Sequence, residues 1–251
     1  HIALIFGLGA ILGKLLADGG GATRIADTLI AKFGQKHVQW AMLIAAFIVG
    51  IALFFEVGLV LLIPLVFTVA KRANVSILKL GLPMVTALSV THGFLPPHPG
   101  PVVIAKELKA NIGEVLLYGM IIAIPVTLIA GPIFNRFAQK MVPTAYTREG
   151  DISSLGTQKE FKEEEMPGFG ISLLTAILPV ILMLISTIVQ LITGHEEATN
   201  VFEQIVYFIG TAGTAMLIAV IFAIFTMGMK QQRKMEDIMK SVTHAIYPIG
   251  M

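Results

Sequence analysis

The sequence predicts an all-α polytopic membrane protein with one broken membrane helix and one element that turns back within the membrane. Of its 251 residues, 55% are hydrophobic and 14% are charged, and the mean hydropathy is +0.82. A soluble domain is nearer a quarter charged. Six long runs contain no Asp, Glu, Lys or Arg: 38–55, 57–70, 80–105, 115–135, 171–194 and 204–229. The run 80–105 carries a cluster of prolines in its middle, which an unbroken helix cannot accommodate.

Composition excludes several other classes of protein. Four of the six runs exceed the roughly 20 residues that a membrane helix needs. The absence of cysteine excludes disulfides and thiol chemistry and fits a bacterial cytoplasmic (inner) membrane. No basic patch with interleaved aromatic residues occurs, which argues against a nucleic-acid partner. The chain opens and closes inside apolar runs without a start methionine, so we expect an internal piece of a longer protein.

The distribution of Lys and Arg predicts how the chain crosses the membrane, because these residues collect in cytoplasmic loops. Loop 230–240 carries four of them and is predicted inside. Loop 194–200 carries two Glu and neither Lys nor Arg, so it is predicted outside. Segment 136–167 mixes both signs and is predicted to be a cytoplasmic linker between two halves. The broken span 80–105 then runs outward, and a span over 114–135 runs back.

The run 38–70 is predicted to be a re-entrant helical hairpin. Its 33 residues exceed one crossing, whereas each of its two arms is short for a full crossing. The segments on both sides of it contain Lys and are predicted to be cytoplasmic. One long tilted helix, the alternative, would place these segments on opposite faces. The tip of the hairpin is predicted at residues 54–58 (Phe-Phe-Glu-Val-Gly).

The remaining elements follow from the same patterns. The end of an inward span is expected over 1–17, and an amphipathic surface helix over 22–35. After the linker, spans are expected over 171–194 and 203–229, and a further span is expected to start at 241.

The segment 92–101 (His-Gly-Phe-Leu-Pro-Pro-His-Pro-Gly-Pro) interrupts a span at membrane depth. Unpaired backbone facing lipid is too costly, so such a break must lie inside protein or beside a water-filled cavity. Interrupted membrane helices are typical of the binding sites of secondary transporters. The sequence therefore predicts part of a secondary transporter.

Glu56 is the carboxylate that lies inside the apolar stretch 38–70. An ionised carboxylate at that depth needs a cavity, a partner or a proton, and burial raises a carboxyl pKa. Glu56 is therefore a candidate for proton coupling or substrate handling. A structural carboxylate that caps backbone amides at the hairpin tip is the alternative.

His92 and His98 flank the proline-rich break. Histidine titrates near physiological pH, which suits a proton-coupled carrier. Both residues are candidates for substrate binding, and His92 is also a candidate for proton coupling. The alternative is that each imidazole only hydrogen-bonds backbone exposed by the break.

Further candidate substrate contacts lie around the two interruptions. In the broken span they are Ser89, Thr91 and Gly93, which offer hydroxyls and exposed backbone. At the hairpin tip they are Phe55 and Gly58. Helix N-termini with free amides favour anions, so a carboxylate substrate fits better than a cation.

Two other interpretations have weaker support. The segment 7–13 (Gly-Leu-Gly-Ala-Ile-Leu-Gly) lies within an apolar helix, so its small residues indicate close helix packing and not nucleotide binding. A membrane enzyme with His92, His98 and Glu56 as metal ligands would need the two histidines on one helical face. Their six-residue spacing does not provide that, and no His-Glu-x-x-His pattern occurs. No cofactor and no metal are expected.

Four segments carry a resemblance to a known family. They are 6–21 (FGLGAILGKLLADGGG), 54–67 (FFEVGLVLLIPLVF), 92–101 (HGFLPPHPGP) and 164–170 (EEMPGFG). Together they resemble the bacterial gluconate:H+ symporter (gluconate permease) family, over essentially the whole chain. That family resembles the larger ion-transporter superfamily, whose fold has inverted repeats, each with a re-entrant hairpin followed by a broken helix.

The resemblance implies a division of the chain and a function. Residues 1–135 would form most of the first inverted repeat and 168–251 the start of the second, with the rest of the site outside this chain. Proton-coupled uptake of gluconate or a related sugar-acid anion is expected. D-serine or another carboxylate, and sodium in place of protons, remain open. Expected partners are the sugar-acid anion, a proton and membrane lipid, and a homo-dimer is possible in this family.

Overall fold

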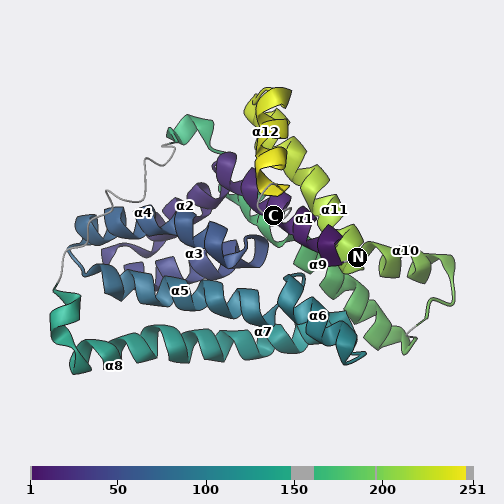
Figure 1. Ribbon diagram of the computed structural model, residues 1–251, viewed down its shortest axis with the longest axis horizontal. Coiled ribbons are helices and arrows are strands. Elements are labelled where there is room, and N and C mark those ends of the chain that lie inside the picture. The colour runs from purple at the N-terminus through teal and green to yellow at the C-terminus, as the bar shows by residue number, and fades with distance from the viewer. Residues whose placement is uncertain (1, 148–160, 196, 247–251) are drawn as a thin grey trace.

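The computed structural model describes residues 2–147, 161–195 and 197–246, and these contain helices and no strands. Figure 1 shows the axes of α2 to α5 and α7 roughly aligned, whereas α1, α9 and α11 cross the molecule obliquely. The helices are α1 (Ile2–Asp18), α2 (Gly21–Phe33), α3 (Val38–Ala52), α4 (Phe55–Ala73), α5 (Ile77–Phe94), α6 (Pro99–Glu107), α7 (Ile112–Leu128), α8 (Phe134–Met141), α9 (Phe169–Thr193), α10 (Val201–Ile209), α11 (Ala212–Ala223) and α12 (Met235–Ile246). Short 3-10 turns η1 (Gln35–His37), η3 (Pro143–Tyr146), η5 (Glu163–Glu165) and η7 (Met229–Gln231), and π-helical turns η2 (Ile129–Ile133) and η6 (Ile224–Gly228), connect or extend them.

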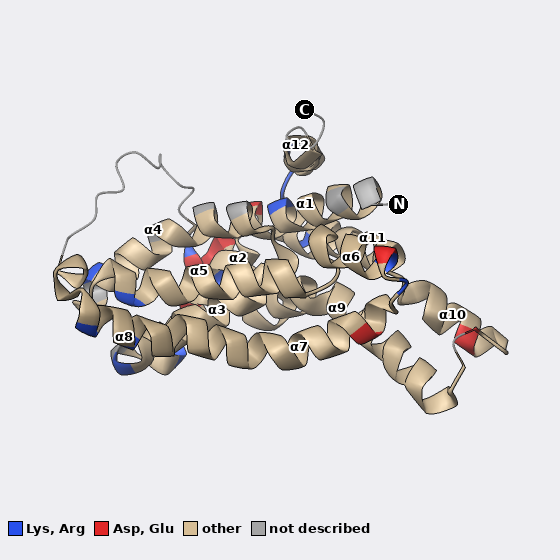
Figure 2. Cartoon of the chain, turned by 60° about the horizontal axis from the view of Figure 1, so that its bottom comes forward, with Lys and Arg blue, Asp and Glu red and all other residues tan. Residues whose placement is uncertain are grey.

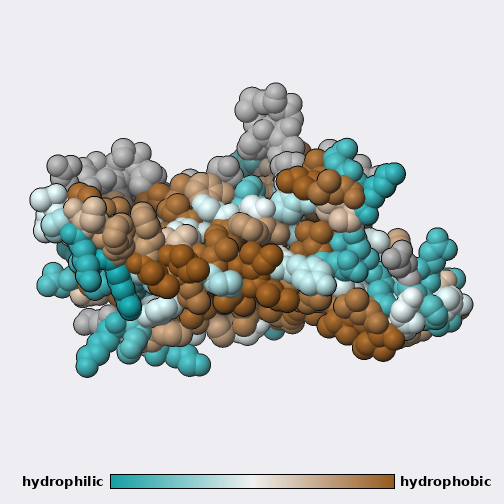
Figure 3. Space-filling model, turned by 90° about the horizontal axis from the view of Figure 1, so that it is seen from below, coloured by the Kyte–Doolittle hydropathy of each residue, from teal (hydrophilic) through white to brown (hydrophobic). Residues whose placement is uncertain are grey.

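Four of the helical stretches are long and apolar enough to cross a membrane: Ile77–Glu107, Ile112–Met141, Phe169–Thr193 and Ala212–Gln231. Hydrophobic residues cover the middle of the face seen in Figure 3, and hydrophilic residues gather at its two ends. Lys and Arg residues cluster around α8 in Figure 2. The all-α membrane class predicted from composition is therefore confirmed.

The run 38–70 is divided into two helices by extended backbone at Leu53 and Phe54. Along α3, Gly50 lies against Leu88 of α5, whereas Leu43 lies beside Gly131, which in turn contacts Pro83 at an earlier position of α5. Helix α3 therefore runs alongside α5 in the same direction.

Helix α4 runs the other way. Its first turns approach α5 where Gly58 meets Leu88, and further along its length Val66 lies beside Gly81. Since α3 is parallel to α5 and α4 is antiparallel to it, α3 and α4 form an antiparallel pair joined at the break. That this pair enters and leaves the membrane on one side stays a prediction.

The span 80–105 is also interrupted, as its prolines predict. Helix α5 ends at Phe94 and α6 begins at Pro99, with a cis peptide bond between Pro96 and Pro97 in the connection. Helix α5 continues through Pro83, so a single proline does not end it. The clustered prolines do, because each removes a donor and crowds the preceding turn.

The span expected over 203–229 differs from the structure. Helix α10 ends at Ile209 with Gly210 as its C-cap, and α11 starts after Thr211, whose backbone is extended. Glycine followed by threonine combines a helix stop with a residue type that favours helix starts. Helix α10 folds back along α9, since Gly210 packs tightly against Ser186 and Tyr207 donates a hydrogen bond to the His195 carbonyl.

The segment 136–167 is partly helical and is attached to the rest of the molecule. Helix α8 extends to Met141, and the buried Tyr146 hydroxyl lies 2.5 Å from the Asn135 side-chain oxygen. At the far end, Arg24 of α2 donates hydrogen bonds to the backbone carbonyls of Glu163 and Pro167. Residues 148–160 lie outside the described part of the chain, so the linker prediction is untested there.

Close packing of α3 on α5 predicts the effect of adding one methyl group. A Cβ atom at Gly50 would overlap the Thr91 hydroxyl and lie 3.2 Å from Leu88 Cδ2. We expect Gly50→Ala to lower the free energy of unfolding by about 1–3 kcal/mol, the usual cost of overpacking. Adding Thr91→Ala to this variant should restore part of the lost stability. Thermal unfolding of the full-length protein measures this.

The matched control is Gly7→Ala, because a Cβ atom at Gly7 inside α1 would meet nothing within 4 Å. Alanine is the better helix former by up to about 1 kcal/mol, so this change should leave stability equal or higher. Equal stability of the Gly50 and Gly7 variants would contradict the packing described here.

Candidate functional site at the two helix breaks

The two interruptions lie side by side, and His98 joins them. His98 comes directly before α6, is 2% exposed, and places Nε2 2.8 Å from the backbone oxygen of Gly50 in α3. The last carbonyl groups of a helix have no partner within the helix, and Gly50 is the third residue from the end of α3. The imidazole therefore supplies a hydrogen-bond donor to backbone that the first break leaves exposed.

This hydrogen bond determines the state of the other ring nitrogen. A carbonyl oxygen only accepts hydrogen bonds, so Nε2 of His98 must carry the hydrogen. In the neutral ring, Nδ1 is then an acceptor. It is buried and has no hydrogen-bond partner in the structure. A buried polar atom without a partner is costly, so this nitrogen is a place where a ligand that donates a hydrogen bond would be stabilised.

His92 brings a second nitrogen of the same kind. The centroids of the His92 and His98 rings are 4.9 Å apart. Nδ1 of His92 is likewise buried without a hydrogen-bond partner. Two unpartnered imidazole nitrogens thus lie within one small volume between the breaks.

Phe54 closes this volume from the hairpin side. Its ring packs edge-on against His92 at a centroid distance of 5.9 Å, and it lies 6.0 Å from the His98 ring. Phe54 was not among the site residues predicted from the sequence. The sequence places Phe54 and Phe55 together at the hairpin tip, and nothing in that pattern distinguishes which ring turns toward the histidines.

Thr91 and Gly58 occupy packing positions next to the cluster. Thr91 is fully buried, and its hydroxyl lies 3.0 Å from the carbonyl oxygens of both Ala87 and Leu88. Gly58 is buried against Leu88. Both residues hold the two interrupted elements close together, and their predicted contact with substrate stays a prediction.

Ser89 and Gly93 lie on a different face of α5. Both are exposed, and a Cβ atom at Gly93 would meet nothing within 4 Å. Val85, which is also exposed, precedes Ser89 by four residues, and Ser89 precedes Gly93 by four. Residues with this spacing lie on one face of a helix. The structure therefore leaves this face open and does not bring it into contact with His98.

The two remaining predicted residues lie in the first turn of α4. Phe55 is half-buried. The backbone of Glu56 belongs to α4, but its side chain lies outside the part of the chain that the structure describes. The predicted role of Glu56 is therefore untested.

The helix starts at the two breaks differ in the donors they offer. Helix α6 begins with Pro99 and Pro101, which have no N–H group. Helix α4 begins at Phe55 without a side-chain cap, so its first N–H groups are the better site for an anion. Within the described residues, no group of three or more His, Cys, Asp or Glu side chains is placed to hold a metal ion.

The whole chain is similar in sequence to known proteins. Residues 1–251 match the profile of the GntP family permease. The chain is 59% identical to the "Gluconate permease" of Bacillus subtilis (strain 168), over 100% of the chain and 56% of that relative. It is 49% identical to the "High-affinity gluconate transporter" of Escherichia coli (strain K12), over 100% of the chain and 55% of the relative.

A third relative is named for a different substrate. The chain is 39% identical to the "D-serine transporter DsdX" of Escherichia coli (strain K12), over 93% of the chain and 51% of the relative. The chain thus spans about half the length of the curated relatives it matches. No solved structure matches it.

The hydrogen bond from His98 to Gly50 predicts a graded response to substitution. Glutamine can place an amide N–H near the position of Nε2, whereas leucine cannot donate. We expect His98→Leu to lower the free energy of unfolding by about 1–3 kcal/mol, because the Gly50 carbonyl is left unsatisfied. His98→Gln should lower it clearly less. Thermal unfolding of the full-length variants distinguishes the two, and equal losses would show that the hydrogen bond is not what stabilises the junction.

Proposed function

Because the chain belongs to the GntP family of permeases, we propose that the full-length protein is a secondary transporter that carries gluconate or a related sugar-acid anion into the cell together with protons. The observation that supports this proposal most is the meeting of two interrupted membrane elements at the His92, His98 and Phe54 cluster. Metalloenzyme chemistry is not part of the proposal, because the relatives are permeases and transporters.

The chemistry of the cluster suits a polyhydroxylated anion. A neutral imidazole nitrogen accepts a hydrogen bond from a hydroxyl group, and a protonated one donates to a carboxylate. The buried Nδ1 atoms of His92 and His98 offer two such positions. We propose that the N–H groups at the start of α4 bind the carboxylate, and that the open face with Ser89 and Gly93 contributes further contacts.

Proton coupling follows from the charge of the substrate. A monoanion entering a cell with a negative interior moves against the membrane potential, which opposes each charge by about 2.3 kcal/mol per 100 mV. Co-transport of at least one proton removes this penalty. We propose Glu56 as the group that binds the proton, with His92 as a second proton carrier, because the buried Nδ1 atom of His92 has no hydrogen-bond partner.

A second candidate substrate is D-serine, which the name of the 39% identical relative supports. Competition by unlabelled gluconate, idonate and D-serine against labelled gluconate uptake separates these substrates. Uptake in sodium-free buffer separates proton coupling from sodium coupling.

The proposal includes two further partners. Exposed apolar side chains on the membrane helix that begins with α7, among them Ile121, Ile124 and Ile129, support contact with membrane lipid. The second is another copy of the same protein in a homo-dimer, and cross-linking of the full-length protein in membranes tests it.

The coupling role of Glu56 makes a direct prediction. In the full-length protein, Glu56→Gln should abolish accumulation of gluconate while sparing exchange of internal for external gluconate, because exchange needs no net proton movement. Transport into vesicles with and without a proton gradient measures both reactions.

The control is Glu107→Gln at the exposed end of α6, which removes an equal charge outside the site and should transport normally. Accumulation at the wild-type level at every pH in Glu56→Gln would remove this residue from the mechanism. Loss of both accumulation and exchange would show that Glu56 binds substrate or supports folding.

A further inference from the structure

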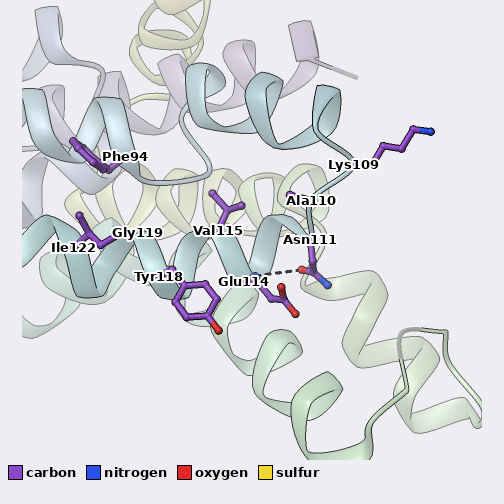
Figure 4. Close-up of a pocket in the computed structure, with 9 residues that line it drawn as sticks. All are labelled: Phe94, Lys109, Ala110, Asn111, Glu114, Val115, Tyr118, Gly119 and Ile122. Carbon is purple, nitrogen blue, oxygen red and sulfur yellow. Dashed lines mark hydrogen bonds between the residues drawn. The ribbon is translucent and has the colours of Figure 1, made fainter.

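A cavity of about 820 Å³ lies at the end of the molecule where α6 turns into α7, and it reaches the break between α5 and α6 only at Phe94. Its lining comes from three places, as Figure 4 shows: Phe94 at the end of α5, the turn from Lys109 to Asn111, and one face of α7. Gly119 lets α7 approach the end of α5 closely, because a Cβ atom there would lie 2.8 Å from the Phe94 carbonyl oxygen. None of these residues belongs to the candidate site.

The lining changes in polarity along α7. Asn111 and Glu114 lie at the start of the helix, Tyr118 follows one turn later, and Ile122 lies a further turn along. Glu114 and Ile122 are eight residues apart, which is roughly 12 Å along a helix. The cavity is thus polar at the end of the molecule and apolar toward the middle of the span.

The position of this gradient corresponds to a membrane interface. The stretch Ile112–Met141 has 30 residues, or roughly 45 Å of helix, which matches a bilayer including its headgroup regions. The first turn of α7 therefore lies at headgroup level. Lys and Arg residues cluster around α8 at the other end of this stretch (Figure 2). Five lie there (Lys71, Arg72, Lys79, Arg136 and Lys140), against Lys106 and Lys109 at the cavity end, so the cavity belongs to the outer leaflet.

Several polar groups at this level are unused by the fold. In the described part of the chain, the Glu114 carboxylate, the Tyr118 hydroxyl and the Lys109 ammonium make no hydrogen bond or ion pair with a side chain. Asn111 differs, because its side-chain oxygen accepts hydrogen bonds from the N–H groups of Gly113 and Glu114, and its nitrogen donates to Gln190. The lining of the cavity therefore includes one negatively charged carboxylate and one positively charged ammonium.

We propose that this cavity is a specific site for a zwitterionic phospholipid with a primary ammonium headgroup. The headgroup ammonium binds the Glu114 carboxylate, and the phosphate lies toward Lys109, whose side chain extends outward from the turn (Figure 4). An acyl chain follows the apolar surface of Phe94, Tyr118 and Ile122. An anionic headgroup would meet Glu114 without an ammonium to neutralise it, and a choline headgroup has no N–H group to donate.

The test uses the full-length protein purified in mild detergent with an equimolar mixture of phosphatidylethanolamine and phosphatidylglycerol. Native mass spectrometry counts the lipids retained, and thermal unfolding measures the stabilisation by each lipid added alone. Phosphatidylcholine is the third lipid. The variants are Glu114→Gln and Lys109→Gln, each matched by a neighbour outside the cavity that changes the net charge equally, Glu107→Gln and Lys106→Gln.

We expect wild type and both control variants to retain phosphatidylethanolamine in preference to the other two lipids. Glu114→Gln and Lys109→Gln should each reduce that preference by roughly fivefold, the effect of one charge contact near a membrane surface. An unchanged preference in Glu114→Gln would overturn the proposal, as would a wild-type preference for phosphatidylglycerol. A cavity that binds gluconate, so that gluconate displaces the lipid and Glu114→Gln weakens gluconate binding, would also overturn it.

Discussion

The hydrogen bond between the His98 imidazole and the Gly50 carbonyl is the contact on which the arrangement of the two interrupted elements depends. Each break exposes backbone groups that lipid cannot satisfy, and this contact satisfies one of them with a side chain from the other break. It also explains why the junction is compact. Gly50 has no side chain, and Thr91 packs where a side chain would be, so the imidazole can reach the α3 carbonyl directly.

The same contact leaves imidazole nitrogens free to bind a transported substrate. With Nε2 of His98 engaged, its Nδ1 and that of His92 remain without partners in a buried volume that the Phe54 ring encloses. Helix α4 starts at this junction with uncapped N–H groups, whereas the prolines of α6 remove donors from the other helix start. An anion is therefore favoured on the hairpin side of the junction, next to the imidazole nitrogens that accept or donate according to protonation.

The interruptions that carry strong local signals could be predicted from the sequence. Four prolines in six positions predict the break between α5 and α6, and the length of 38–70 with Lys on both sides predicts a turn near Phe54. The break at Gly210 was missed, because an apolar run without charges reads as one span although α10 folds back along α9. Contacts between distant segments could not be predicted from the sequence either. Which side chains of α5 face α3 depends on the rotation of the helix, so the burial of Thr91 and the exposure of Ser89 could not be read from spacing alone.

The absence of cysteine from the chain makes thiol labelling the most direct measurement of where substrate binds. The open space at Gly93 accepts a side chain without a clash, so a single cysteine introduced there in an otherwise cysteine-free full-length protein reports on the face of α5 beside the junction. Saturating gluconate should protect Gly93→Cys from a thiol reagent, while Gly7→Cys in α1 should react equally with and without gluconate. Equal labelling at Gly93 in the presence and absence of bound gluconate would contradict the proposal that substrate bound at the two breaks also contacts the open face of α5.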